Sequence, residues 1–197
     1  MIKRSLIILV LIFYLPNLSN ADDIRDFQIE GMSLGDSALD YFSKEEINSG
    51  VKTNFRDKKF FAVDLNYSPK NYDAIQLNLK THDKNFIIYG VVGGIFITKK
   101  KECIKYQNEI VNEINNIFKD FTKRHTKWNH PYDKTGRSKI DQIIFDLKNN
   151  TGSVVVSCYF WSKKIKNKEG WGDSIRVELY TKKYADWLVK EAHTDPK

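Results

Sequence analysis

Cysteine and histidine are scarce in this chain, which has two cysteines and four histidines among its 197 residues. A zinc site needs three or four ligands at close spacing. Only His125 and His130 lie near one another in the sequence, and His82 and His193 are far from both. No recognisable catalytic or cofactor signature is present either. We therefore expect neither a metal site nor a cofactor.

Long apolar runs are missing as well, except at the start of the chain. Residues 6–15 are ten apolar residues that follow two cations and end at Pro16. A membrane-spanning helix needs roughly 20 apolar residues, and the small residues Ser19 and Ala21 fit a signal-peptidase site. We predict a secretory signal peptide at residues 1–21, no transmembrane span after cleavage, and a periplasmic or secreted product. An uncleaved membrane anchor is the alternative.

No linker or low-complexity tract divides the rest of the chain. We predict one α+β domain at residues 22–197, built either as a single unit or as two halves, 22–98 and 99–197. The first half has 9 Lys and Arg against 12 Asp and Glu, whereas the second has 21 against 13. A basic half favours an anionic partner, and export favours an anionic glycan, a lipid headgroup or an envelope protein over nucleic acid. The alternative is a general bias toward surface lysine.

The clearest secondary-structure signal is an amphipathic helix at residues 101–124, where apolar residues recur at spacings of three and four. Short apolar or alternating runs before and after it predict strands. The predicted fold is an antiparallel sheet of two three-stranded meanders with the long amphipathic helix packed on one face. The predicted meanders are 60–67, 74–81 and 86–98, then 140–148, 153–162 and 174–181. Other expected elements are a strand at 27–32, a helix capped by Ser33, an irregular segment at 126–139, a lysine-rich loop at 162–172 and a closing helix at 184–193.

The two cysteines lie where one bond can join the long helix to the sheet. Cys103 is in the first turn of the predicted helix, and Cys158 is in the apolar strand at 153–162. Two cysteines in an exported protein are more often bonded than free. We predict a Cys103–Cys158 disulfide that closes a loop of 55 residues; two buried free thiols are the alternative, because spacing in sequence does not give distance.

Cations and aromatic residues gather in two segments that strand pairing is expected to bring together. A four-residue turn at 149–152 would place Lys139 opposite Ser162, so that segments 126–139 and 162–172 meet at one end of the sheet. Such an end can bind phosphate- or carboxylate-bearing glycans through charge-assisted hydrogen bonds and ring stacking. The alternative is a solvated lysine-rich end with tryptophans packed beneath it. The candidate anion-binding residues are Lys134, Thr135, Arg137, Ser138, Lys139, Lys163, Lys164, Trp128 and Trp161.

Enzyme-like patterns occur, but they lack the context that their chemistry needs. Ser49-x-x-Lys52 resembles the nucleophile motif of penicillin-binding serine enzymes, but here it leads into a strand, whereas those enzymes place the serine at the start of a buried helix. We therefore expect a binding or interaction domain with no catalytic residue. The alternatives are an envelope-polymer hydrolase that uses Asp133, Asp141 or Asp173, and a structural assembly module.

Two segments carry a resemblance to known proteins. Residues 29–37 read I-E-G-M-S-L-G-D-S, and residues 133–138 read D-K-T-G-R-S. Together with the two cysteines they resemble a family of uncharacterised short exported bacterial proteins that open with I-E-G-[M/I]-S-[L/I]-G-D-S. The resemblance implies export and assigns no active residue. Residues 31–33 are also similar to the opening of the helix in small outer-membrane assembly lipoproteins, but the chain lacks their lipid-bearing cysteine.

Overall fold

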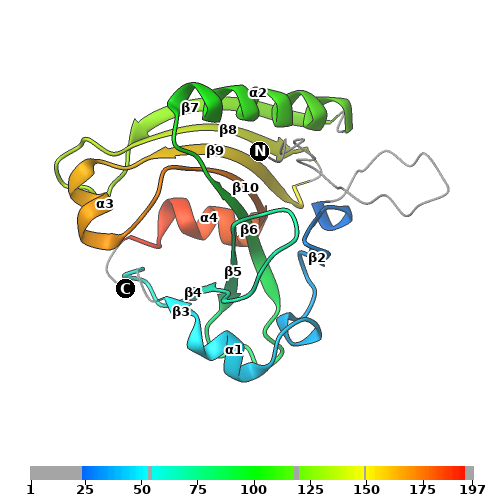
Figure 1. The fold of residues 1–197 in the computed structure, drawn as a ribbon. Coiled ribbons are helices and arrows are strands. Elements are labelled where there is room, and N and C mark those ends of the chain that lie inside the picture. The colour runs from blue at the N-terminus through cyan, green and yellow to red at the C-terminus, as the bar shows by residue number, and fades with distance from the viewer. Residues whose placement is uncertain (1–23, 53–54, 118–119, 149, 194–197) are drawn as a thin grey trace.

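The computed structural model describes residues 24–52, 55–117, 120–148 and 150–193 (Figure 1). The predicted signal peptide at residues 1–21 lies outside the described residues. Within them, eight strands form one antiparallel sheet in the order β3-β4-β5-β6-β10-β9-β8-β7. The strands are β3 Val51–Lys52, β4 Phe60–Asp64, β5 Ala74–Lys80, β6 Ile88–Phe96, β7 Phe121–Asn129, β8 Lys139–Leu147, β9 Gly152–Phe160 and β10 Ser174–Thr181. A separate two-stranded sheet pairs β1 Gln28–Ile29 with β2 Met32–Ser33.

This arrangement confirms the α+β class and the antiparallel pairing, but it corrects the expected pair of three-stranded meanders. Strands β3 to β6 are neighbours in sequence order, and so are β7 to β10. The two sets join through β6 and β10, which pair from Gly90 with Tyr180 to Phe96 with Ser174. Each half of the chain therefore supplies four strands to one shared sheet.

The strand β7 was missed by the sequence prediction, which continued the long helix to Arg124. The helix is α2 Lys100–Ile117, and β7 follows from Phe121 to Asn129. Most β7 side chains are exposed on both faces because β7 is the outermost strand of the sheet. An edge strand of this kind lacks the alternation of apolar and polar residues that identifies a half-buried strand. Its Thr and aromatic residues favour extended structure, and its pairing with β8 makes it a strand.

The sheet is covered by different helices on its two faces. Helix α2 runs across the outer face, where its buried residues pack on those of β9 and β10 (Figure 1). The sheet curves around α4 Lys182–Lys190, whose Tyr184 and Trp187 are buried against the hollow face (Figure 1). The prediction of the long helix on one face is confirmed, and the closing helix takes the opposite face.

The disulfide prediction is confirmed. Cys103 and Cys158 are bonded, with their Cα atoms 6.1 Å apart, and neither residue is exposed to solvent. One turn further along α2, the buried Gln107 amide donates hydrogen bonds of 2.9 Å to the backbone carbonyls of Asp141 and Val156. A covalent bond and two hydrogen bonds therefore fix α2 to β8 and β9.

The hairpin between β8 and β9 has the predicted faces but a different register. Lys139 pairs with Phe160 rather than with Ser162. The offset is two residues, which is the repeat of a strand, so every side chain keeps its predicted face. Ile143 pairs with Val156 rather than with Cys158, and Cys158 still faces α2.

The short helices begin at capping side chains. Ser33 lies in β2 and does not cap the predicted helix; Ser37 caps a 3-10 turn, η2 Ala38–Asp40, instead. Ser43 and Glu46 form a reciprocal capping box at the start of α1 Lys44–Ser49, which satisfies two backbone donors. The expected lysine-rich loop contains α3 Lys163–Glu169, which Ser162 caps. A further 3-10 turn, η1 Ile24–Asp26, opens the described chain.

Candidate functional site at the basic and aromatic end of the sheet

Two segments that are far apart in sequence meet at one end of the sheet, beside α3 (Figure 1). The backbone N–H of Ser162 donates a 2.9 Å hydrogen bond to the Ser138 hydroxyl. The Tyr132 hydroxyl donates a 2.7 Å hydrogen bond to Glu169, and the rings of Tyr132 and Trp171 lie 4.9 Å apart. We call the region formed by residues 128–139 and 161–171 the basic–aromatic end.

The loop between β7 and β8 is organised around the buried carboxylate of Asp133. One oxygen accepts hydrogen bonds from the backbone N–H and the hydroxyl of Thr135, at 3.0 and 2.7 Å. The other oxygen accepts hydrogen bonds from the backbone N–H and the hydroxyl of Ser138, also at 3.0 and 2.7 Å. The hydroxyls of Ser138 and Thr135 hold the pKa of Asp133 well below its usual value, because they stabilise the ionised form. Thr135 and Ser138 therefore use their donors to hold the loop, which leaves none of these donors for an external anion.

The other two acids that the hydrolase alternative needs are also engaged. Asp173 accepts a 2.8 Å hydrogen bond from the backbone N–H of Trp161 and a 2.7 Å hydrogen bond from the Lys166 ammonium. Asp141 lies 2.6 Å from the His125 ring nitrogen and 2.9 Å from the Lys127 ammonium. Each carboxylate therefore has a structural partner inside the described chain.

Aromatic rings form a continuous series across this end. The ring centroids of Trp128 and His130 are 6.4 Å apart and nearly parallel, and His130 is 4.5 Å from Trp161. Trp161 is 4.6 Å from Trp171, which contacts Tyr132. Trp128 is 44% exposed and Tyr132 is 42% exposed, whereas Trp161 is buried between them. The two end rings of the series are therefore exposed to solvent, and its middle ring is buried.

Two residues that the sequence analysis did not single out extend this series onto the hollow face. The Arg176 guanidinium carbon lies 4.0 Å from the centroid of the Tyr159 ring, and Tyr159 lies 6.0 Å from His130. Burial, together with the charges of Arg176 and His193, lowers the pKa of His130 to about 4. The sequence signal that could have identified Arg176 is the alternation of residues 174–181, because it places Arg176 on the face opposite to Ile175 and Val177.

All five predicted cations are exposed, and four of them form no hydrogen bond with a described residue: Lys134, Arg137, Lys163 and Lys164. None of the four forms an ion pair with a described residue, whereas nearby Lys166 and Lys168 are paired with acids. Lys139 donates a hydrogen bond to Asn129. Since the Ser138–Ser162 hydrogen bond joins the two segments, Arg137 lies one residue from it on one side, and Lys163 one residue from it on the other.

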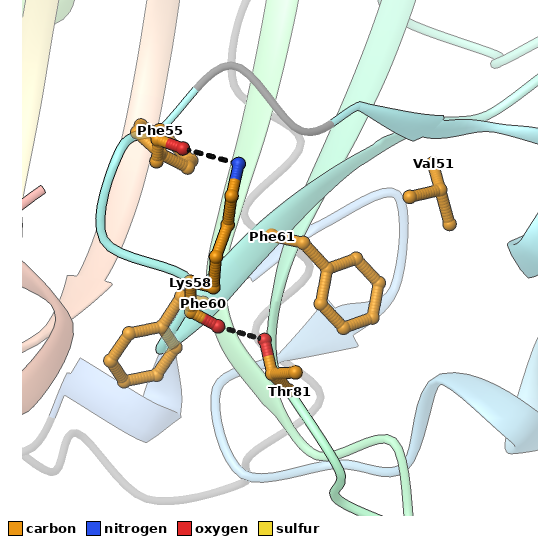
Figure 2. Close-up of a pocket in the computed structure, with 6 residues that line it drawn as sticks. All are labelled: Val51, Phe55, Lys58, Phe60, Phe61 and Thr81. Atoms are coloured by element: carbon orange, nitrogen blue, oxygen red, sulfur yellow. Dashed lines mark hydrogen bonds between the residues drawn. The ribbon is translucent and has the colours of Figure 1, made fainter. Parts of the chain in front are cut away.

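A pocket of about 240 Å³ lies near β3 and β4, at the edge of the sheet that is formed by β3 and not by β7 (Figure 2). Its walls are mainly apolar. The Lys58 ammonium donates a 2.8 Å hydrogen bond to the Phe55 carbonyl, and the Thr81 hydroxyl donates to the Lys58 carbonyl. The pocket is lined by Val51, Phe55, Lys58, Phe60, Phe61 and Thr81. The Lys58 ammonium and the Thr81 hydroxyl thus donate to backbone carbonyls.

The comparisons with known proteins add no functional assignment: no protein-family model, curated protein or solved structure matches this chain. Within the part of the chain that the structure describes, no group of three His, Cys, Asp or Glu residues is placed to hold a metal ion. Among those same residues, no helix has the length and apolar character needed to cross a membrane.

Proposed function

We propose that this chain is an exported, non-enzymatic binding domain that holds anionic envelope glycans at the basic–aromatic end. The observation that carries the proposal is the position of four exposed cations beside a continuous series of aromatic rings. None of these cations has an acidic partner among the described residues. Ammonium and guanidinium groups bind carboxylate or phosphate substituents, and aromatic faces stack on sugar rings.

Export supports the choice of ligand and is part of the same proposal. A disulfide such as Cys103–Cys158 persists in oxidising compartments, and the apolar leader and the resemblance to exported proteins point the same way. In the periplasm or outside the cell, the abundant anionic polymers are envelope glycans rather than nucleic acids.

The hydrolase alternative receives less support from this site. A glycosidase needs one carboxylic acid that stays protonated at working pH, so that it can donate to the leaving group. The hydrogen bonds of Ser138 and Thr135 lower the pKa of Asp133, which keeps this carboxyl ionised. Asp141 and Asp173 are held by cations.

Binding of a labelled oligogalacturonate tests the proposal, with a malto-oligosaccharide as the uncharged control. We expect saturable binding of the acidic glycan that weakens as sodium chloride is raised, because solvent-exposed charges are screened beyond about 10 Å at 0.1 M salt. The uncharged glycan should bind weakly at every salt concentration. Equal affinities for the two glycans would overturn the proposal. Tighter binding to phosphatidylglycerol vesicles than to the glycan would assign the end to lipid headgroups instead.

A further inference from the structure

Strand β7 forms one outer edge of the eight-stranded sheet and pairs with a neighbour on one side only. It runs for nine residues, Phe121–Asn129, without a shift in register. Just past one end of β7, the backbone N–H of His130 donates a 2.9 Å hydrogen bond to the Ser138 carbonyl. Just before the other end, the Asp120 carbonyl accepts a 3.1 Å hydrogen bond from the backbone N–H of Lys148. Both bonds continue the register of β7 with β8, so the even-numbered residues of β7 direct their backbone groups to β8.

The odd-numbered residues of β7 direct their backbone N–H and C=O groups away from the sheet, because the two sets alternate along an antiparallel strand. They are Phe121, Lys123, His125, Lys127 and Asn129. None of these backbone groups forms a hydrogen bond with a described residue. The edge therefore presents a row of donors and acceptors about 27 Å long, which suits the pairing of another extended chain.

Most of the features that protect an edge strand are missing from β7. Native proteins shorten such strands, interrupt them with proline or a bulge, or cover them. The strand at the opposite edge, β3, is only two residues long. In contrast, β7 contains no proline or glycine, its register is unbroken, and most of its side chains are exposed. Its cations are the remaining protective feature, and they select the strands that can pair with it.

Lys123, His125 and Lys127 share one face of the sheet, because alternate residues of a strand point to the same side. Among the described acids, only Asp141 pairs with any of them, at 2.6 Å from His125 and 2.9 Å from Lys127. Antiparallel pairing with a second copy about His125 would place Lys123 opposite the second copy's Lys127. Like charges at directly opposed positions destabilise a sheet, whereas opposite charges stabilise it. The edge therefore disfavours a second copy and favours a strand that carries carboxylates.

We infer that the edge of β7 binds an acidic protein segment in extended form, which adds one strand to the sheet. Backbone hydrogen bonds hold the segment, and carboxylates at every second residue face Lys123, His125 and Lys127. The residues that carry this inference, 121–127, lie outside the basic–aromatic end. The inference therefore does not rest on the proposed function, and either can fail without the other.

Synthetic peptides of nine residues with capped ends test the inference on the oxidised natural chain. The probe alternates threonine with glutamate, and its counterpart has lysine in place of glutamate. We expect the glutamate peptide to bind about tenfold or more tightly than the lysine peptide, because three cross-strand charge pairs change sign. In antiparallel pairing, the residues opposite Lys123, His125 and Lys127 are those whose N–H groups meet β7. N-methylation of the glutamates should therefore abolish binding, whereas N-methylation of the threonines should leave most of it.

His125→Pro and His125→Ala test the same contact from the side of the protein. Both remove the ring and its contact with Asp141, but only proline removes the outward N–H, which an edge strand tolerates. The alanine variant should keep binding of the glutamate peptide, and the proline variant should lose it. In the natural chain, this peptide should slow hydrogen exchange at the amides of Lys123, His125 and Lys127. The N-methylated peptides are measured on the natural chain, so their result does not depend on the folding of either variant.

Three results would overturn the inference. The first is no binding of the glutamate peptide, and the second is equal binding of its two N-methylated forms. The third is protection of the Lys123, His125 and Lys127 amides that increases with protein concentration in the absence of peptide, because it would assign the edge to a second copy.

Discussion

Cys103 and Cys158, neither of which is exposed to solvent, bond the first turn of α2 to β9 on the outer face of the sheet. The bond joins residues that are 55 positions apart, and the loop between them contains β7 and β8. The outermost strand, β7, has few buried side chains to stabilise it. It lies inside this covalently closed loop. In the unfolded chain the same closure removes conformational freedom.

Replacing both cysteines by alanine should lower the free energy of unfolding by about 4 kcal/mol, the loop-closure value for a 55-residue loop. Urea unfolding of the double variant and of the oxidised natural chain measures the difference. The reduced natural chain is the control and should unfold close to the double variant. A loss below about 1 kcal/mol in both would show that the bond contributes little.

Gly93 and Gly94 give a matched test of packing in β6. A Cβ added at Gly93 would lie 2.4 Å from the Tyr72 ring, whereas at Gly94 the nearest atoms are 3.9 Å away. Gly93→Ala should cost about 1–3 kcal/mol because the ring must move. Gly94→Ala should change stability by less than about 0.5 kcal/mol. Equal effects in thermal unfolding would contradict the close contact with Tyr72.

Ser138→Ala should destabilise the basic–aromatic end. The buried hydroxyl donates to Asp133 and accepts from the Ser162 backbone N–H, so its loss removes one hydrogen bond from the Asp133 carboxylate and leaves the Ser162 N–H without this acceptor. We expect a decrease of about 1–3 kcal/mol in the free energy of unfolding. Ser68→Ala is the control, because Ser68 is exposed. Unchanged stability, with unchanged hydrogen exchange in residues 130–138, would argue against the Asp133-centred loop.

His130 should make the folded chain less stable in mild acid. Its pKa is about 4 in the folded state, against an ordinary value of 6.5. Above pH 6.5 the ring is neutral in both states and contributes no pH dependence. As the pH falls from about 6.5 to about 4, the unfolded chain binds a proton that the folded chain does not, so stability falls.

His130→Phe should flatten the dependence of stability on pH in this window while it keeps an aromatic ring in the series. NMR titration of the imidazole protons of His130 measures the pKa directly. A midpoint near 6.5 in the folded chain would show that burial and the neighbouring cation do not act on the ring as described.

The sequence predicted the elements that one apolar pattern defines. The stripe of α2 and the alternation of β8, β9 and β10 are each produced by burial on one side. The disulfide was predicted from the expected export, from the position of Cys103 beside that stripe and from that of Cys158 in an apolar strand. Such local patterns predict an element correctly because the same face of the helix or strand is buried whatever the order of strands in the sheet.

Features that depend on tertiary context were missed. The strand β7 is polar on both faces, so only its pairing with β8 from Phe121 to Asn129 makes it a strand. The roles of Thr135 and Ser138 could not be inferred from spacing, because their residue types suit an external anion as well as the internal carboxylate of Asp133. Arg176 was predicted as part of a strand, but the ring beneath it comes from β9, so its stacking on Tyr159 depends on the register between the two strands.

The most direct test of the central claim is a double charge reversal at the basic–aromatic end, Lys134→Glu with Arg137→Glu. Lys44→Glu with Lys84→Glu is the control, because it changes the net charge equally at exposed positions in the other half of the chain. For labelled oligogalacturonate, we expect the first variant to lose tenfold or more in affinity, since two contacts of roughly 1 kcal/mol each are reversed. The control should lose about twofold or less through long-range attraction alone. Equal losses in the two folded variants would show that net charge, and not this end of the sheet, binds the glycan.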